Sequence, residues 1–279
     1  LLDADHPANG VLFARRFTTV LDATPARLVE LAAATGCAHV CLFTFIPPAA
    51  AGHFPVVDAA DVADLRARMD DHRVTAGNLE VFPLDGAEDR DAFARALDVG
   101  ARLGATRATA HLHAVTDPEE AVARFAAFAG LAHSFGIIAG LEFMRFSAIP
   151  TIGEAARIVR EAGAGALVCD ALHLFREGGT IADVAANADL ISYVQLADGP
   201  PTCPDDQRWS EAVRMRALAG TGAFPLEQLL GALHRPLLVE VEVPRADDRR
   251  AGVGDLDRAR AAVAASREVI TRASVRKNS

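Results

Sequence analysis

The sequence predicts a single (β/α)8 barrel, an α/β fold in which parallel strands alternate with helices. Short apolar or β-branched runs alternate with longer stretches of helical spacing, which is typical of βα units around a parallel sheet. Eight such units can be counted, the number that this barrel requires. The 279 residues, 51% of them hydrophobic, can form one large core, although length alone also allows two smaller domains. We expect one domain over residues 1–279.

The units follow one another in a regular order along the chain. The expected strands begin near Arg16, His39, Thr75, Arg107, Ile137, Ala166, Ile191 and Leu237. The expected helices begin near Pro25, Asp61, Arg90, Pro118, Ile152, Thr180, Pro225 and Asp255.

Proline and glycine residues support these helix boundaries. Proline suits the first helical turn, and the sequence places it there at positions 25, 118 and 225, with Thr24 and Asp117 as expected N-caps. Glycines 36, 104 and 136 follow predicted helices, where a left-handed residue is expected. The alternative is a doubly wound sheet, but no Gly-rich phosphate loop follows any predicted strand.

One long insert, Ala197–Thr221, separates the seventh predicted strand from its helix and is rich in Pro, Asp and charge. Functional loops of a barrel lie on the face where strands end, so this insert could fold over a substrate. The alternative is a solvent-exposed excursion with a short helix of its own.

Charge and cysteine usage narrow the classes of partner. The net charge of −9 and the absence of a basic cluster outside Arg272–Lys277 argue against nucleic acid as a partner. No apolar run reaches the roughly 18 residues of a membrane span, so we expect a cytoplasmic protein without a membrane partner. The four cysteines form no CxxC pair, and we expect them to be reduced and structural.

Four oxygen-bearing side chains close apolar runs that are predicted strands: Glu142, Asp170, Gln195 and Glu242. Burying a carboxylate alone is costly, and all strands of a barrel end at the same mouth, so we expect these oxygens to share a bound divalent cation. Each residue taken singly could instead be a salt-bridging strand end. A set of ligands that is rich in oxygen and contains no thiolate favours Mn²⁺ or Mg²⁺, and it could also bind Co²⁺ or Zn²⁺.

Further polar residues surround this predicted site. Glu240 and Glu242 project to the same face of one strand, and Glu242 is assigned to the metal because it lies nearer the mouth. Substrate-binding candidates are His173 and Arg176, expected in the loop after Asp170, and His113, which lies nearer the mouth than its same-face neighbour His111. Glu80, expected at the end of the third strand, could also line the cavity. Packed or surface positions are the alternative for each.

A cation flanked by two carboxylates suits proton abstraction next to a carbonyl, because the cation stabilises the enediolate that results. Glu142 and Glu242 are the expected catalytic pair, since they come from non-adjacent strands and could approach a carbon from opposite sides.

The motifs around these residues resemble those of the xylose isomerase-like TIM-barrel superfamily, the sugar phosphate isomerase and epimerase group that includes endonuclease barrels. They are LEFM at 141–144, DALHLFREGG at 170–179, VQLADGP at 194–200 and VEVP at 241–244. The resemblance implies one divalent ion, often Mn²⁺ or Mg²⁺, on the four residues named above, with His173 beside the substrate. Many relatives carry His where this chain has Gln195, and Gln there is similar to some 3-dehydroshikimate dehydratases.

The sequence therefore predicts a metal-dependent isomerase or epimerase acting on a small sugar or keto-polyol. A dehydratase, a lyase using the same proton abstraction, is the first alternative. A sugar-binding barrel without turnover is the second. The extra His ligands of the endonuclease branch are not apparent. The sequence defines neither the exact substrate nor the oligomeric state.

Overall fold

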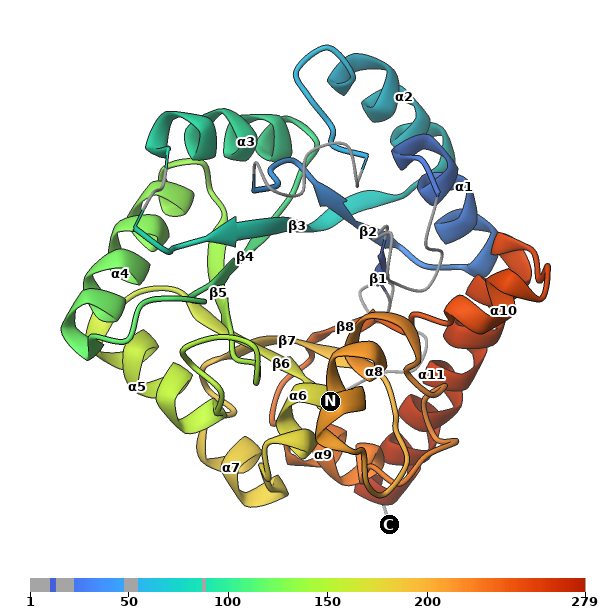
Figure 1. Cartoon of the computed structure of the whole chain (residues 1–279). Coiled ribbons are helices and arrows are strands. Elements are labelled where there is room, and N and C mark those ends of the chain that lie inside the picture. Colours follow the sequence, from blue (N-terminus) through green and yellow to red (C-terminus); the bar gives the residue numbers. More distant parts are fainter. Residues whose placement is uncertain (1–10, 14–22, 48–54, 87–88, 279) are drawn as a thin grey trace.

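The centre of the computed structural model is a closed barrel of eight parallel strands that pair in chain order (Figure 1). The structure describes residues 11–13, 23–47, 55–86 and 89–278. Strand β1 closes the barrel by pairing with β2 on one side and β8 on the other, with Val11 opposite Glu240. The strands are β1 (Val11–Phe13), β2 (His39–Phe43), β3 (Thr75–Pro83), β4 (Arg107–His111), β5 (Ile138–Glu142), β6 (Ala166–Asp170), β7 (Ile191–Leu196) and β8 (Leu238–Val241).

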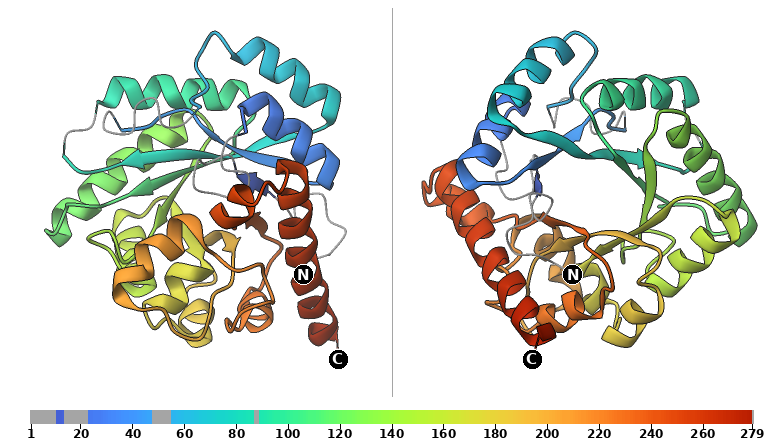
Figure 2. Two further views of the ribbon diagram at one scale, coloured as in Figure 1. Left: turned by 45° about the vertical axis from the view of Figure 1, so that its right-hand side comes forward. Right: turned by 180° about the vertical axis from the view of Figure 1, so that it is seen from behind.

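Helices surround the strands on the outside of the barrel, and α11 lies beside α1 (Figure 2). They are α1 (Pro25–Thr35), α2 (Val62–His72), α3 (Arg90–Arg102), α4 (Pro118–Ser134), α5 (Ile152–Ala162), α6 (Ala171–Arg176), α7 (Ile181–Ala186), α8 (Arg208–Arg214), α9 (Leu226–Ala232), α10 (Ala246–Arg250) and α11 (Asp255–Asn278), with a 3-10 turn at Asp205–Gln207. In the described part of the chain, no helix combines the length and the apolar character needed to span a bilayer.

Most strand boundaries agree with the sequence. The predicted starts are confirmed at His39, Thr75, Arg107, Ala166 and Ile191, and they are one residue early at Ile137 and Leu237. The start near Arg16 falls outside the described residues, and the first strand of the structure is Val11–Phe13.

Capping residues explain why the helices begin and end where they do. Thr24 and Asp117 are confirmed as N-caps whose side chains accept backbone N–H groups, each followed by proline in the first turn. The prediction for Pro225 was wrong by one position, because it is itself the N-cap and α9 begins at Leu226. The glycines at 36, 104 and 136 have φ of 71°, 81° and 73°, as a left-handed helix end requires.

Apolar side chains fill the space between the strands and the helices, whereas the inside of the barrel is partly polar. A small interior cluster combines Cys41, Val168, Tyr193 and Leu238, from strands on opposite sides of the barrel. The Tyr193 hydroxyl contacts Thr109 at 2.5 Å and accepts from Asn78 Nδ2 at 3.0 Å. This buried polar layer lies beneath the ends of the strands.

The insert Ala197–Thr221 folds back on the barrel and is organised by Asp198. Its buried carboxylate accepts the backbone N–H groups of residues 199, 220, 222 and 224 at 2.9 to 3.0 Å. Backbone bridges then pair Asp198 with Ala217 and Met215 with Arg245. The insert contains a short helix, α8, and it returns across the ends of β7 and β8.

Candidate active site

Three donor side chains meet where β5 and β6 end. Glu142 is the last residue of β5, Asp170 is the last of β6, and His173 lies one turn later on α6. One ligand atom from each lies within 4.8 Å of the other two, and all three residues are buried. The structure thus brings together two of the four predicted metal ligands and one predicted substrate-binding residue.

Glu142 is held by a histidine on the neighbouring strand. His111 Nε2 lies 2.6 Å from Glu142 Oε2, and both side chains are almost fully buried. With Nε2 protonated, His111 donates to the carboxylate and fixes its orientation. His111, which the sequence placed farther from the mouth than His113, is therefore the β4 histidine that contacts Glu142.

Asp170 has one oxygen for the helix and one for the mouth. Oδ1 accepts from the backbone N–H groups of Leu172 and His173 at 2.7 and 3.2 Å, which makes Asp170 the N-cap of α6. Oδ2 accepts from Arg216 Nη1 at 2.7 Å. Burial raises the pKa of Asp170, but Arg216, His173 and these hydrogen bonds outweigh it and leave the pKa below its ordinary value. Asp170 is ionised at neutral pH.

Arg216 is a functional residue that the sequence reasoning missed. Its guanidinium lies 2.7 Å from Asp170 Oδ2 and 3.3 Å from Glu242 Oε2, and it is 3% exposed. Burial lowers its pKa, but the two carboxylates outweigh this and raise it. Glu242 follows the end of β8, and Arg216 joins it to Asp170. The sequence feature that pointed toward Arg216 is the insert that contains it, because the length and charge of the insert indicated a functional loop.

Gln195 and Glu240 form a fully buried pair on neighbouring strands. They are opposite in register, and Gln195 Nε2 donates to Glu240 Oε1 at 3.0 Å. This bond holds the amide so that Gln195 Oε1 points elsewhere, and that oxygen has no hydrogen-bond partner among the described residues. Burial, and secondly Glu80, raise the pKa of Glu240 well above its ordinary value.

His173 lies on helix α6 and not in a loop, which corrects the prediction for it and for Arg176. The helix starts there because Asp170 caps it. Burial lowers the pKa of His173, so the imidazole is neutral at pH 7. Its ring lies 6.3 Å from that of Phe146, which in turn contacts Trp209 of α8 edge-on at 4.9 Å. Trp209 is 57% exposed.

The other two predicted substrate-binding residues have protein partners. Arg176 pairs with Glu211 of α8 at 2.5 Å and lies over the ring of Phe224. It therefore fastens the insert to α6. His113 is exposed, and its Nδ1 lies 3.2 Å from the carbonyl oxygen of Phe146.

Glu80 does not end its strand. Strand β3 continues to Pro83, so Glu80 is an interior residue of β3 and is fully buried inside the barrel. Its carboxylate lies within 4.8 Å of Cys41 Sγ and of Glu240, in a group separate from the one at the mouth.

The donor set at the mouth fits a divalent cation. It offers the carboxylates of Glu142, Asp170 and Glu242 and the His173 imidazole. The buried amide oxygen of Gln195, which accepts no hydrogen bond from the part of the chain that the structure describes, lies on the strand next to that of Asp170. Buried acceptor oxygens without a donor are costly, and hard divalent ions prefer such oxygens.

Three solved structures resemble this fold over nearly its whole length. An IolI protein with a binding zinc atom is 18% identical and has a TM-score of 0.73, over 94% of this chain and 98% of that chain. D-allulose 3-epimerase from Methylomonas sp. is 17% identical with a TM-score of 0.69, over 95% and 97%. D-psicose 3-epimerase with D-tagatose from Clostridium cellulolyticum H10 is 14% identical with a TM-score of 0.70, over 94% and 99%.

No curated protein sequence matches the chain. These three solved structures are less than 25% identical to the chain, so they show the shared fold alone. A family does match in sequence. The family described as "Xylose isomerase-like TIM barrel" matches residues 29–270, a range that includes every residue of the site described above. The chain therefore belongs to the xylose isomerase-like TIM-barrel family.

Proposed function

We propose that this protein is a divalent-metal-dependent isomerase or epimerase of a small sugar or keto-polyol. The observation that carries the proposal is the meeting of Glu142, Asp170 and His173 within 4.8 Å at the ends of β5 and β6. Family membership and the epimerase structures of the same fold support it. The barrel mouth is also the face on which this architecture carries its chemistry.

In this proposal, Glu142, Asp170, Gln195 and Glu242 hold the cation, and Mn²⁺ or Mg²⁺ suits their oxygens best. Co²⁺ and Zn²⁺ also suit a set that includes a carboxylate and an imidazole nearby. When bound, the cation polarises the substrate carbonyl and stabilises the negative charge that forms as a proton leaves.

Glu142 and Glu242 are the proposed proton-transfer pair. His111 Nε2 lies 2.6 Å from Glu142 Oε2 and restrains the carboxylate, which in this proposal takes the proton from the substrate carbon next to the carbonyl. Glu242 lies on the other side of Arg216 from Asp170, directly after β8, which is not adjacent to β5 in the barrel. One carboxylate takes the proton and the other returns one. Return to the opposite face of the same carbon inverts its configuration, and return to the former carbonyl carbon moves the carbonyl to its neighbour.

Neutral His173 can donate to or accept from a substrate hydroxyl, because its pKa is lowered by burial. We assign His113 the outer part of the cavity. Arg176 is proposed to act on substrate indirectly, because its guanidinium is already bound to Glu211 and secures the insert.

The test is to incubate candidate ketoses and keto-polyols with Mn²⁺-loaded protein in deuterated water. Deuterium next to the carbonyl and an isomeric product of unchanged composition are expected for the wild type. Glu142→Gln and Glu242→Gln should each lower turnover at least a hundredfold, the usual contribution of a general base, with circular dichroism unchanged.

The products also separate the alternatives. The dehydratase alternative, favoured by the amide at Gln195, predicts a product that has lost water from a dehydroshikimate-like acid. A sugar-binding barrel predicts binding without deuterium exchange. Wild-type rates in both glutamine variants would contradict the assigned proton-transfer pair.

A further inference from the structure

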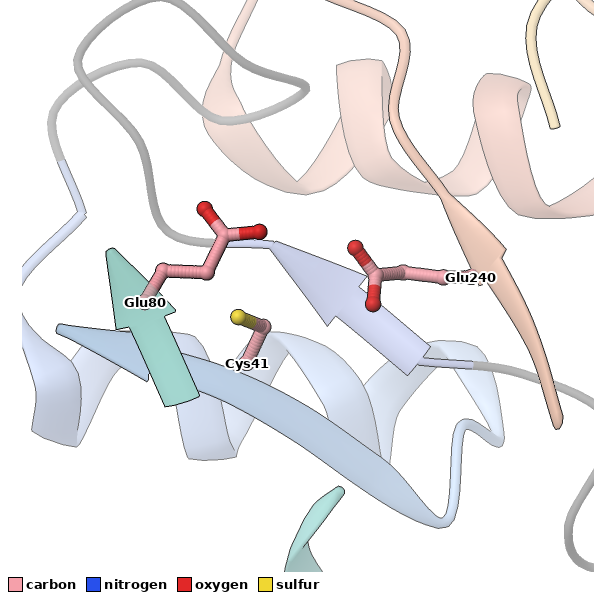
Figure 3. Close-up of side chains that lie close together, drawn as sticks. All are labelled: Cys41, Glu80 and Glu240. Carbon is pink, nitrogen blue, oxygen red and sulfur yellow. The ribbon is translucent and has the colours of Figure 1, made fainter. Parts of the chain in front are cut away.

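A second group of donor side chains lies inside the barrel, away from the three that meet at the mouth. It consists of Cys41 on β2, Glu80 on β3 and Glu240 on β8, and Figure 3 shows the three side chains pointing toward one another. The Cys41 sulfur and one carboxylate oxygen of each glutamate lie within 4.8 Å of one another. The three residues are 2%, 0% and 0% exposed.

This spacing is close to that of ligands around one small cation. A tetrahedral zinc ion binds sulfur at about 2.3 Å and carboxylate oxygen at about 2.0 to 2.2 Å, which places ligand atoms roughly 3.5 Å apart. Rotation about the side-chain bonds of the two glutamates can move their carboxylate oxygens by about an ångström. Such a movement would bring the three ligand atoms to those distances.

Hydrogen bonds from neighbouring amide groups already orient two of the three proposed metal ligands. Asn78 Nδ2 lies 3.5 Å from Cys41 Sγ, and Gln195 Nε2 lies 3.0 Å from Glu240 Oε1. Asn78 is itself fixed by Thr109 and Tyr193. An outer shell of N–H donors behind the ligand atoms is typical of metal sites, and a donor facing sulfur favours the thiolate.

One oxygen atom of this group gives independent evidence that a cation binds here. Glu240 Oε2 is buried and accepts no hydrogen bond from any residue that the structure describes. A buried carboxylate oxygen that is left unsatisfied destabilises the folded protein, because it has lost its hydrogen bonds to water. A cation bound by this oxygen would remove that cost.

We propose that Cys41, Glu80 and Glu240 bind a second divalent cation inside the barrel, of the thiophilic class represented by Zn²⁺ and Co²⁺. A thiolate ligand favours these ions over Mg²⁺ and Mn²⁺, which suit the oxygen-rich mouth. The order of the sheet is β8, β1, β2, β3, so this ion joins strands on both sides of β1, where the first strand closes against the last. Its role is structural, because binding free energy of such an ion adds to the stability of the closed barrel.

Cobalt spectroscopy tests this site separately from the mouth. Wild-type protein reconstituted with Co²⁺ should show a thiolate-to-cobalt charge-transfer band in the near ultraviolet, which the mouth, having no thiolate, cannot produce. Cys41→Ser should abolish the band. The matched control is Cys169→Ser, a buried cysteine of the apolar core on β6, which should keep it.

A second variant guards against misfolding of Cys41→Ser. Glu240→Gln keeps the volume of the side chain and should weaken Zn²⁺ binding at this site at least tenfold, with circular dichroism unchanged. The proposal would be overturned if the wild type showed no charge-transfer band, or if the band persisted in Cys41→Ser. Glu80 and Glu240 would then share a proton in place of a cation. Loss of the mouth ion alone, as in Asp170→Asn, should leave the band intact, so failure of the proposed function is distinguished from failure of this site.

Discussion

Arg216 is the residue on which the electrostatics of the mouth depend. Its guanidinium compensates Asp170 and Glu242, all three being almost fully buried. Removing one partner of a buried ion pair leaves an uncompensated charge, which costs about 3–5 kcal/mol. A divalent cation bound by the same carboxylates would restore part of this compensation.

We therefore expect Arg216→Met to lower the free energy of unfolding of the metal-free protein by about 3 kcal/mol. Added Mn²⁺ should raise its melting temperature more than that of the wild type. Thermal melts with and without Mn²⁺ measure both effects. Arg260→Met is the control, because the Arg260 side chain is 59% exposed and its Nη1 lies 3.7 Å from Asp257 Oδ1. Equal Mn²⁺ stabilisation of wild type and Arg216→Met would argue against a shared cation.

At the scale of the element, the insert Ala197–Thr221 carries Arg216 into the mouth, and Asp198 gives it its shape. Four backbone N–H groups converge on that buried carboxylate. Asp198→Asn replaces one acceptor oxygen by a donor, so we expect about 3 kcal/mol less stability and faster proteolysis within the insert. Limited proteolysis and hydrogen exchange measure this. Asp206→Asn changes an exposed residue of the same insert and should behave as wild type.

The contact between α1 and α11 gives a pH dependence. Arg27 binds Asp255 through two hydrogen bonds of 2.9 and 3.0 Å, and the first of the causes that lower the pKa of Asp255 is this bond. Because the folded-state pKa is below the unfolded value of about 3.9, the stabilisation is complete above that pH. It is lost as the pH falls through the folded pKa.

Asp255→Asn should therefore cost about 0.5–1 kcal/mol at pH 7, since the pair is partly exposed. The difference from wild type should vanish at the lowest pH, where Asp255 is protonated. Urea unfolding at a series of pH values measures it. Asp257→Asn provides the control, because Asp257 is 70% exposed and 3.7 Å from its partner. A difference that stays constant with pH would contradict the pair as the cause.

At the scale of the whole molecule, the fold was predictable because its signals are local. Apolar runs, prolines at helix starts and glycines at helix ends each reflect the backbone within a few residues, and the apolar strand run recurs eight times. The strand-end position of Glu142 and Asp170 followed from the same runs. The family match is consistent with this prediction.

What the sequence did not predict depends on tertiary contacts. Arg216 and His111 enter the site through packing between distant segments, for which no periodic pattern exists. Glu80 was expected at the end of the third strand, whereas β3 continues for three more residues to Pro83. The pairing of Gln195 with Glu240 depends on strand register, which the pattern of apolar residues does not determine to one residue.

The central claim, a divalent cation at the mouth of the barrel, is tested most directly by metal content. Elemental mass spectrometry would compare wild type with Asp170→Asn, which removes a charge yet keeps a side chain that caps α6 well. Asp117→Asn, an exposed cap of α4, is the matched control. We expect one equivalent less in Asp170→Asn than in wild type and in the control. Equal metal content in all three proteins would contradict the account.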